Sequence, residues 1–384
     1  MLYFRMGSQL HRLVTMLSVV GEFPMCSLYL LGNERVYKAL VHKLTKQETF
    51  RNCMTGEELT CRLYTVTGKA KSKSLRLYKG ALPILNWLHP DAYRYYMTSF
   101  WNHRFPGDLS HRERNHRVAE AVAFCMRVRL EFRQYMLPTL QNQDRLEILP
   151  DTPVFYQSKD LKRIGDNEMN KTMFTRLVGA LFCGNSCYAI YNTRNAVMKW
   201  SGMGEFKTLH HLLEVGRLNG KITNIDSALL IGEDYSVAMD TLIESGKNRR
   251  LEFRFDSIYH HIHFVPMDES GIRLFRIMIL PDWKNRLLDL MFEPESRSYG
   301  QGYFEYDAYI DGVYIFSHLD SDLARLMRFR EAVQSQYERY EVVCFTHQRT
   351  FVREYLGEGV GIKTIDLDTV EAALGPERRS VIEC

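Results

Sequence analysis

No two cysteines in this sequence are separated by two residues, the spacing that a structural zinc site usually needs. Cys183 and Cys187 lie closest together, and no second pair matches them. With neither a zinc signature nor a disulfide framework, a reducing cytoplasm is the expected compartment. The eight cysteines are scattered: Cys26, Cys53, Cys61, Cys125, Cys183, Cys187, Cys344 and Cys384.

Long apolar runs and nucleotide-binding glycine loops are missing as well. The apolar stretch at residues 13–31 is interrupted by Glu22 and Pro24, so we expect neither a membrane span nor a signal peptide. Two glycine clusters, at residues 202–204 and 357–361, have no Gly-Lys-Ser/Thr ending and no helix start in register. They therefore do not predict a nucleotide site.

The composition is that of an ordinary globular protein. Of 384 residues, 45% are hydrophobic, 25% are charged and 12% are aromatic. This length allows two or three domains with sizeable cores, and the aromatic content argues against disorder.

An amphipathic helix is predicted over residues 33–46. Asn33 follows a glycine and is a good N-cap, because its side chain can accept a hydrogen bond from the first turn. Helical spacing gives the segment one apolar face and one cationic face. The apolar face is expected to hold Val36, Leu40 and Leu44, with Tyr37 and Val41 beside them, and the cationic face Arg35, Lys38, His42 and Lys46.

A β-hairpin with a basic tip follows this helix. Residues 60–66 alternate as a strand, residues 67–74 form the tip, and residues 75–78 form the return strand. The cations of the tip and return strand are Lys69, Lys71, Lys73 and Arg76. Two helices are predicted before the cationic one, at residues 9–20 and 25–31, so the order is that of a winged helix-turn-helix.

Positive charge is concentrated in this segment. Residues 33–80 hold eleven Lys and Arg against four Glu, which is +7, whereas the whole chain is only +4. Phosphate binding requires such a local excess. Taken singly, a solvated helix or a charged surface hairpin would be the plainer interpretation. The combination favours double-stranded DNA as the partner, and a homodimer stays open.

The rest of the chain is predicted to be a connector and an α/β domain. Residues 89–107 are interpreted as irregular, and a capping box beginning at Ser110 predicts a long helix to about residue 134. From residue 150, strand-like and helix-like segments alternate, including a helix at 170–182 and a strand at 274–280. The expected domains are a winged helix at 1–90, a helical connector at 91–149 and a mixed-sheet α/β domain at 150–384, giving an α+β or α/β fold.

Two groups of residues could hold a divalent metal. On a strand, His261 and His263 point to one face, and HUH nickases hold their metal on a histidine-hydrophobe-histidine strand. Neither a third ligand nor a nucleophilic tyrosine stands out, and surface histidines are the plainer interpretation.

The second group is acidic. Paired carboxylates could hold Mg²⁺ for phosphodiester hydrolysis, with Asp307 as the leading ligand. A PD-(D/E)xK nuclease needs an acid-x-Lys pair after its first Asp, and none follows Asp307. Glu205-Phe206-Lys207 has the right form but precedes it, so turn and cap roles are the alternative. The group comprises Glu305, Asp307, Asp311, Asp320 and Asp322.

The order of these segments resembles the replication-relaxation family, winged-helix proteins of bacterial plasmids and integrative elements. The likeness rests on the winged helix, the long basic-edged helix, and a C-terminal part containing residues 342–348 and 364–367. It implies a DNA-binding domain joined to a degenerate endonuclease-like domain. This chain departs from a nuclease at the missing acid-x-Lys pair.

The expected function is therefore double-stranded DNA binding in the replication, transfer or transcriptional control of a mobile element. Arg35, Lys38 and His42 would face base edges, with Lys46 on the same helix face, while Lys69, Lys71, Lys73 and Arg76 would hold phosphates. The alternatives are a metal-dependent nickase or nuclease using His261 and His263, or Asp307, and a protein–protein adaptor.

Overall fold

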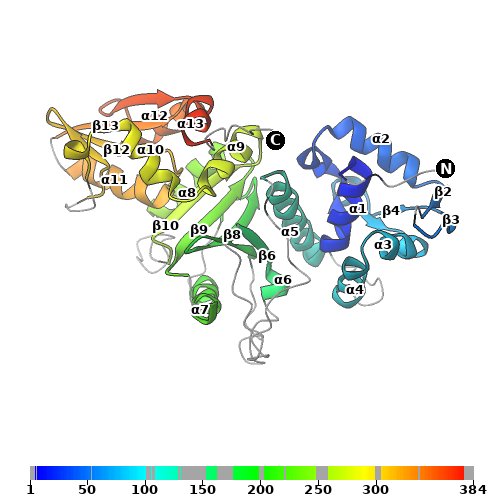
Figure 1. The fold of residues 1–384 in the computed structure, drawn as a ribbon. Helices are drawn as coiled ribbons and strands as arrows, with labels where there is room; N and C mark the ends of the chain where they lie inside the picture. Colours follow the sequence, from blue (N-terminus) through cyan, green and yellow to red (C-terminus); the bar gives the residue numbers. More distant parts are fainter. Residues whose placement is uncertain are drawn as a thin grey trace, which may run out of the picture. The chain divides into compact units, whose positions relative to one another are not determined.

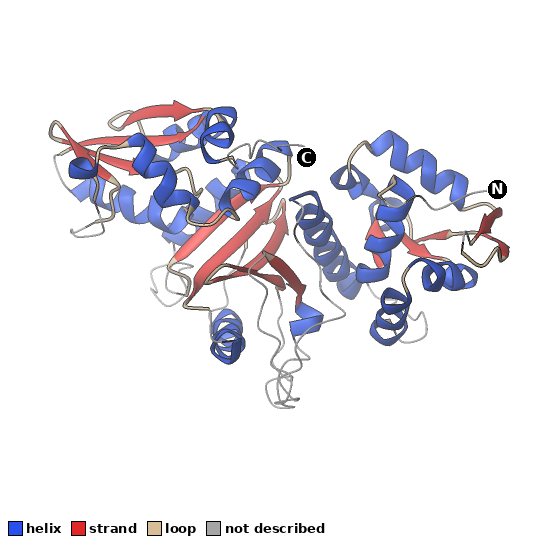
Figure 2. Ribbon diagram, in the orientation of Figure 1, coloured by secondary structure: helices blue, strands red, loops and turns tan. Residues whose placement is uncertain are grey.

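The chain divides into two compact units, Met1–Leu181 and Phe182–Cys384, which are described one at a time (Figure 1). A computed structural model describes residues 5, 7–52, 54–100, 105, 109–128, 130, 153–161, 176–198, 203–219, 222–247, 258–298, 304–335 and 338–375. Figure 2 shows helices and strands in both units, so a mixed α+β class is confirmed. The predicted domain boundaries near residues 90 and 149 stay a prediction.

The first unit begins with helices around a small sheet. Its elements are α1 (Gln9–Val20), β1 (Glu22–Pro24), the 3-10 helix η1 (Met25–Leu31), α2 (Glu34–Leu44), β2 (Glu48–Arg51), β3 (Glu58–Cys61), β4 (Tyr64–Thr67), η2 (Ala70–Ser72), β5 (Ser74–Leu77), η3 (Lys79–Ala81), α3 (Leu82–Leu88), α4 (Pro90–Ser99), α5 (Leu109–Val128), β6 (Val154–Gln157) and α6 (Ser158–Leu161).

Local signals set the ends of α1. The Ser8 hydroxyl accepts a hydrogen bond from the backbone N–H of His11 at 3.2 Å, which caps the first turn. The helix ends at Gly21, whose φ of 77° favours glycine. A Cβ there would also lie 2.4 Å from the ring of Phe100, so α4 and its following residue pack closely on this turn.

Three strands form an antiparallel sheet in the order β1-β5-β4, while β2 and β3 form a separate hairpin. The strand expected over residues 60–66 is therefore split. Cys61 pairs with β2, whereas Tyr64 pairs with Leu77 of β5. Between them, the N–H of Leu63 donates to the carbonyl of Leu44 at 2.9 Å, which takes this residue out of either ladder.

The interpretation of residues 89–107 as an irregular connector is wrong for residues 90–99, which form α4. His89 caps this helix through Nδ1, which accepts from the N–H of Ala92 at 3.3 Å, and Pro90 occupies the first position. Tyr95 and Tyr96 are buried with Ala92, at the spacing of one helix face. These two tyrosines belong to the core.

Helix α5 packs along α1, β1 and η1, and Figure 1 shows it beside α1. It begins at Leu109, so the expected N-cap Ser110 lies inside the helix. The predicted end near residue 134 lies outside the described residues. Buried polar contacts join α5 to η1 and β5: Ser27 Oγ donates to Glu120 Oε1 at 2.6 Å, and Ser74 Oγ lies 2.6 Å from His116 Nε2.

The second unit holds a four-stranded sheet and most of a five-stranded one. The sheet orders are β11-β12-β13-β14 and β10-β9-β8-β7-β6. The pairs β12–β13, β13–β14, β8–β9 and β9–β10 are parallel, and β11–β12 is antiparallel. Its elements are β7 (Leu177–Cys183, across the unit boundary), β8 (Ser186–Arg194), α7 (Met203–Asn219), β9 (Asn224–Gly232), α8 (Tyr235–Lys247), β10 (His261–Pro266), α9 (Glu269–Met278), α10 (Trp283–Met291), η7 (Pro294–Ser296), β11 (Ala308–Ile310), β12 (Val313–Ser317), α11 (Leu323–Ser335), β13 (Arg339–Phe345), η8 (Thr346–Gln348), α12 (Arg349–Leu356), β14 (Gly361–Ile365) and α13 (Leu367–Leu374).

Two predicted elements in this region have the opposite type. The helix expected at 170–182 is strand β7 over its described part, because a short, wholly buried apolar run has the same pattern in either state. The strand expected at 274–280 is helix α9, capped by Asp268, whose carboxylate accepts from the N–H of Gly271 at 2.9 Å. Within the described ranges, no helix is long and apolar enough to cross a membrane.

Candidate functional site

Basic side chains are exposed along α2 and just past its end. Arg35, Lys38 and His42 are exposed, and so is Lys46 just past the helix end. Asn33 caps the helix as expected, since its Oδ1 accepts from the N–H of Val36 at 3.3 Å. Within the helix, Arg35, Lys38 and His42 fall within about one quadrant of the circumference, given 100° per residue, and Lys43 is also exposed.

The buried face of α2 differs from the expected one. Tyr37, Val41 and Leu44 are buried, at positions i, i+4 and i+7, whereas Val36 is 40% exposed. These three buried side chains pack the helix against the rest of the first unit, on the side away from the basic residues. Lys38 pairs with Glu34 one turn earlier at 2.7 Å, and both side chains are substantially exposed, so this pair contributes little stability.

The hairpin tip between β4 and β5 is closed by its own hydrogen bonds. The hydroxyl of Ser72 donates to the carbonyl of Lys69 at 2.8 Å, and the N–H of Ser72 donates to the same carbonyl at 3.0 Å. Lys69 and Lys73 are exposed, while the side chain of Lys71 lies outside the described residues. The tip therefore presents at least two cations on an ordered turn.

Arg76 has a different environment from the tip lysines. Its Nε and Nη2 donate to Glu22 Oε2 at 3.2 and 2.8 Å, and its guanidinium lies 4.2 Å from the centre of the Phe105 ring. Glu22 is fully buried and also accepts from Asn115 Nδ2 at 3.1 Å. Arg76 is therefore engaged inside the first unit.

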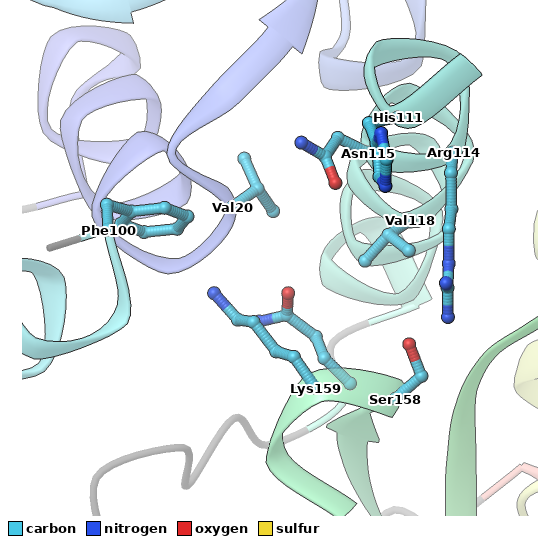
Figure 3. Close-up of a pocket in the computed structure, with 9 residues that line it drawn as sticks. Val20, Phe100, His111, Arg114, Asn115, Val118, Ser158 and Lys159 are labelled. Carbon is cyan, nitrogen blue, oxygen red and sulfur yellow. The ribbon is translucent and has the colours of Figure 1, made fainter. Parts of the chain in front are cut away.

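A cavity of about 220 Å³ lies between α1, α5 and α6 of the first unit (Figure 3). Lys159 projects toward Phe100 in this view, and its Nζ lies 4.1 Å from the ring centre and 2.9 Å from the carbonyl oxygen of Val19. Burial lowers the pKa of Arg114. The lining residues are Val20, Phe100, His111, Arg114, Asn115, Val118, Gln157, Ser158 and Lys159.

The second unit gathers histidines and acids at β10. His263, Asp320 and Asp322 each offer a ligand atom, and these atoms lie within 4.8 Å of one another. From the sequence, His263 was a candidate metal ligand, and both aspartates belonged to the acidic group. Their proximity could not be predicted from the sequence, because it depends on how the turn after β12 packs on β10.

His261 is not one of the three clustered residues, but it contacts one of them. Its Nδ1 lies 2.7 Å from Asp322 Oδ2. Burial by itself would lower the pKa of His261, but the hydrogen bond and the charge of Asp322 outweigh burial and raise it. The rings of His261 and His263 are nearly parallel at 6.2 Å, as expected for alternate residues on one strand face.

Asp307, the third candidate ligand, is occupied elsewhere. Its two carboxylate oxygens each lie 3.1 Å from Arg325 Nη2, and Oδ2 also accepts from the N–H of Ser317 at 2.7 Å. Arg325 is buried and also donates to Glu305 and Asp320. Arg325 could not be predicted from the sequence, since a helical arginine is ordinarily a surface residue.

Neighbouring cations favour the ionised forms of Asp320 and Glu305. Burial would raise the pKa of Asp320, but Lys284 and Arg325 hold it well below its usual range. Burial would also raise the pKa of Glu305, and Arg325 and Arg328 lower it instead. Asp311, another acid of the group predicted from the sequence, lies in the β11–β12 turn with a φ of 51°, which matches the turn role given as the alternative.

No protein-family model, curated protein or solved structure matches this chain. The resemblance to the replication-relaxation family therefore stays an expectation.

Proposed function

We propose that the first unit binds double-stranded DNA through the exposed face of α2 and the β4–β5 hairpin tip. Arg35, Lys38 and His42 are exposed on one face of α2, whose other face is buried, and Lys46 is exposed just past the helix end; this exposure carries the proposal. Exposed cations on one helix face suit a DNA groove, where side chains reach both phosphates and base edges.

The order of elements supports a winged helix. A helix, a short strand, a 3-10 helix and the basic helix precede the hairpin, and the sheet order β1-β5-β4 places the first short strand against the second hairpin strand. In helix-turn-helix proteins, the recognition helix lies in the major groove, and basic side chains on a neighbouring hairpin can contact phosphates. The β2–β3 hairpin is an insertion between these two parts.

The proposal retains most, but not all, of the DNA contacts predicted from the sequence. Arg35, Lys38 and His42 face base edges in this proposal, and Lys69 and Lys73 hold phosphates. Arg76 is left out because its guanidinium is bound to the buried Glu22. A role in replication, transfer or transcriptional control of a mobile element rests on the family resemblance.

Binding to a labelled duplex over a salt series tests the proposal. Each phosphate contact contributes roughly 0.9 to the slope of log affinity against log salt, so Lys69→Ala/Lys73→Ala should lower the slope by about 2. Arg94→Ala/Lys247→Ala is the matched control, because it removes two exposed cations from α4 and α8. Failure of the wild type to bind duplex DNA, or equal slopes for both variants, would contradict the proposal.

A further inference from the structure

Three side chains from two segments of the second unit converge at one buried point. His263 comes from β10, while Asp320 and Asp322 come from the turn between β12 and α11. Their exposed fractions are 9%, 2% and 0%, and their ligand atoms lie within 4.8 Å of one another. Two carboxylates at such a distance, largely hidden from water, need compensating positive charge.

Main-chain contacts hold this arrangement in place. The N–H of Phe264 donates to the carbonyl of Ser321 at 2.9 Å, and the N–H of Ser321 donates to the carbonyl of His318 at 3.0 Å. Asp322 Oδ1 accepts from the N–H of Ile262 at 3.0 Å and from the N–H groups of Ala324 and Arg325 at the start of α11. The backbone of β10 thus fixes Asp322 and Ser321, and Asp320 directly precedes them in the same turn.

The hydrogen bond of His263 sets which ring nitrogen is available. Its Nδ1 lies 2.9 Å from the carbonyl oxygen of Asp320, and a carbonyl oxygen accepts only, so Nδ1 carries the proton. In the neutral imidazole, Nε2 then holds a lone pair. A histidine whose Nδ1–H donates to a backbone carbonyl is the usual arrangement of a histidine that binds metal through Nε2.

We propose that His263, Asp320 and Asp322 bind one divalent transition-metal ion, such as Zn²⁺ or Mn²⁺. One imidazole with two carboxylates suits these ions, whereas Ca²⁺ and Mg²⁺ prefer oxygen ligands alone. Ligand atoms around zinc stand about 3.3 Å apart, so binding draws the three side chains together by up to about 1.5 Å.

Lys284 gives the site a built-in competitor. Its ammonium pairs with Asp320 Oδ2, and its side chain is 31% exposed, so it can move into solvent when an ion enters. Arg325 Nη1 lies 3.3 Å from the same oxygen but is buried and also bound to Asp307 and Glu305. Entry of the ion therefore displaces Lys284 and leaves Arg325 in place.

The test uses the full chain, stripped of metal with a chelator. Zn²⁺ affinity and stoichiometry are measured by competition with a chromophoric chelator, and Mn²⁺ binding by loss of the free-ion electron paramagnetic resonance signal. The wild type should bind one ion. His263→Gln and Asp320→Asn should each lower the affinity by about 100-fold or more, because each removes a ligand.

Two further variants separate metal binding from general damage. Asp307→Asn disturbs the same Arg325 network without removing a ligand, so it should bind Zn²⁺ within about threefold of the wild type. Lys284→Met removes the competing ammonium and should raise the affinity by about tenfold. Circular dichroism checks that each variant is folded.

Several outcomes would overturn the metal site. They are a wild type that binds no stoichiometric ion, an affinity unchanged in both His263→Gln and Asp320→Asn, and an equal loss in Asp307→Asn. A lower affinity in Lys284→Met would also contradict it. None of these results depends on DNA binding by the first unit, so the two proposals fail separately.

Discussion

Arg76 and Glu22 are direct partners across strands β5 and β1, and their side chains meet in a double hydrogen bond. Glu22 has no exposed surface, and Arg76 keeps 13% of its side chain exposed. A cation that the sequence assigns to a DNA-facing hairpin therefore neutralises an acid inside the fold.

Replacing Arg76 should damage stability more than DNA binding. Arg76→Met leaves the Glu22 carboxylate without its main cation and should cost roughly 3–5 kcal/mol in the free energy of unfolding, measured with urea at pH 7. Arg76→Met/Glu22→Gln should recover part of that loss. A variant as stable as the wild type, with a reduced salt slope for DNA binding, would instead place Arg76 on phosphate.

Arg35 should contribute to sequence selection. An arginine that faces a base edge makes contacts worth about 1–3 kcal/mol against the wrong base. Selection from a randomised duplex library should yield a preferred site for the wild type, and Arg35→Ala should relax one or two positions of it. Lys73→Ala should weaken binding to all sequences alike. If both variants keep the same preferred site, Arg35 does not read bases.

Lys159 should stabilise the end of α1. Its ammonium donates to the carbonyl of Val19 at 2.9 Å and lies 4.1 Å from the centre of the Phe100 ring. A cation at a helix C-terminus and over an aromatic ring contributes about 1–2 kcal/mol in total. Lys159→Met keeps the aliphatic volume and should lower the free energy of unfolding by that amount. Lys207→Met, at an exposed position of α7, is the control and should change it by less than about 0.5 kcal/mol.

Local signals in the sequence were enough for α1 and α2. Each has a clear apolar period, and Asn33 caps α2 as expected. Periodicity failed where an apolar run was short and wholly buried, as in β7, and where a helix carried adjacent apolar residues, as in α9. The aromatic residues of α4 led to the interpretation of this segment as irregular, although it is a helix that His89 caps.

The candidate metal group shows what the sequence could not supply. The alternation of His261 and His263 indicated a shared strand face, and this is a local property. The approach of Asp320 and Asp322 to His263 spans nearly sixty residues and depends on hydrogen bonds between β10 and a turn. Asp307 looked equivalent to these acids, but Arg325 binds it instead.

His318 should make the fold sensitive to mild acid. The imidazole is completely buried, neither ring nitrogen has a hydrogen-bond partner among the described residues, and burial lowers its pKa to about 4. An unfolded histidine titrates near 6.5, so below that pH the unfolded chain binds the proton more readily. The resulting stability is complete above about pH 6.5 and falls by up to roughly 3 kcal/mol as the pH approaches 4.

Replacing the ring isolates this effect. His318→Phe keeps an aromatic side chain stacked on Phe316, whose ring centre lies 6.3 Å away, and removes the titrating group. Urea unfolding between pH 7 and pH 5, with chelator present, should show a shallower loss of stability for the variant than for the wild type. This range stays above the region where the lowered pKa of Glu305 begins to matter. Parallel curves for the two proteins would mean that His318 is not kept neutral by the fold.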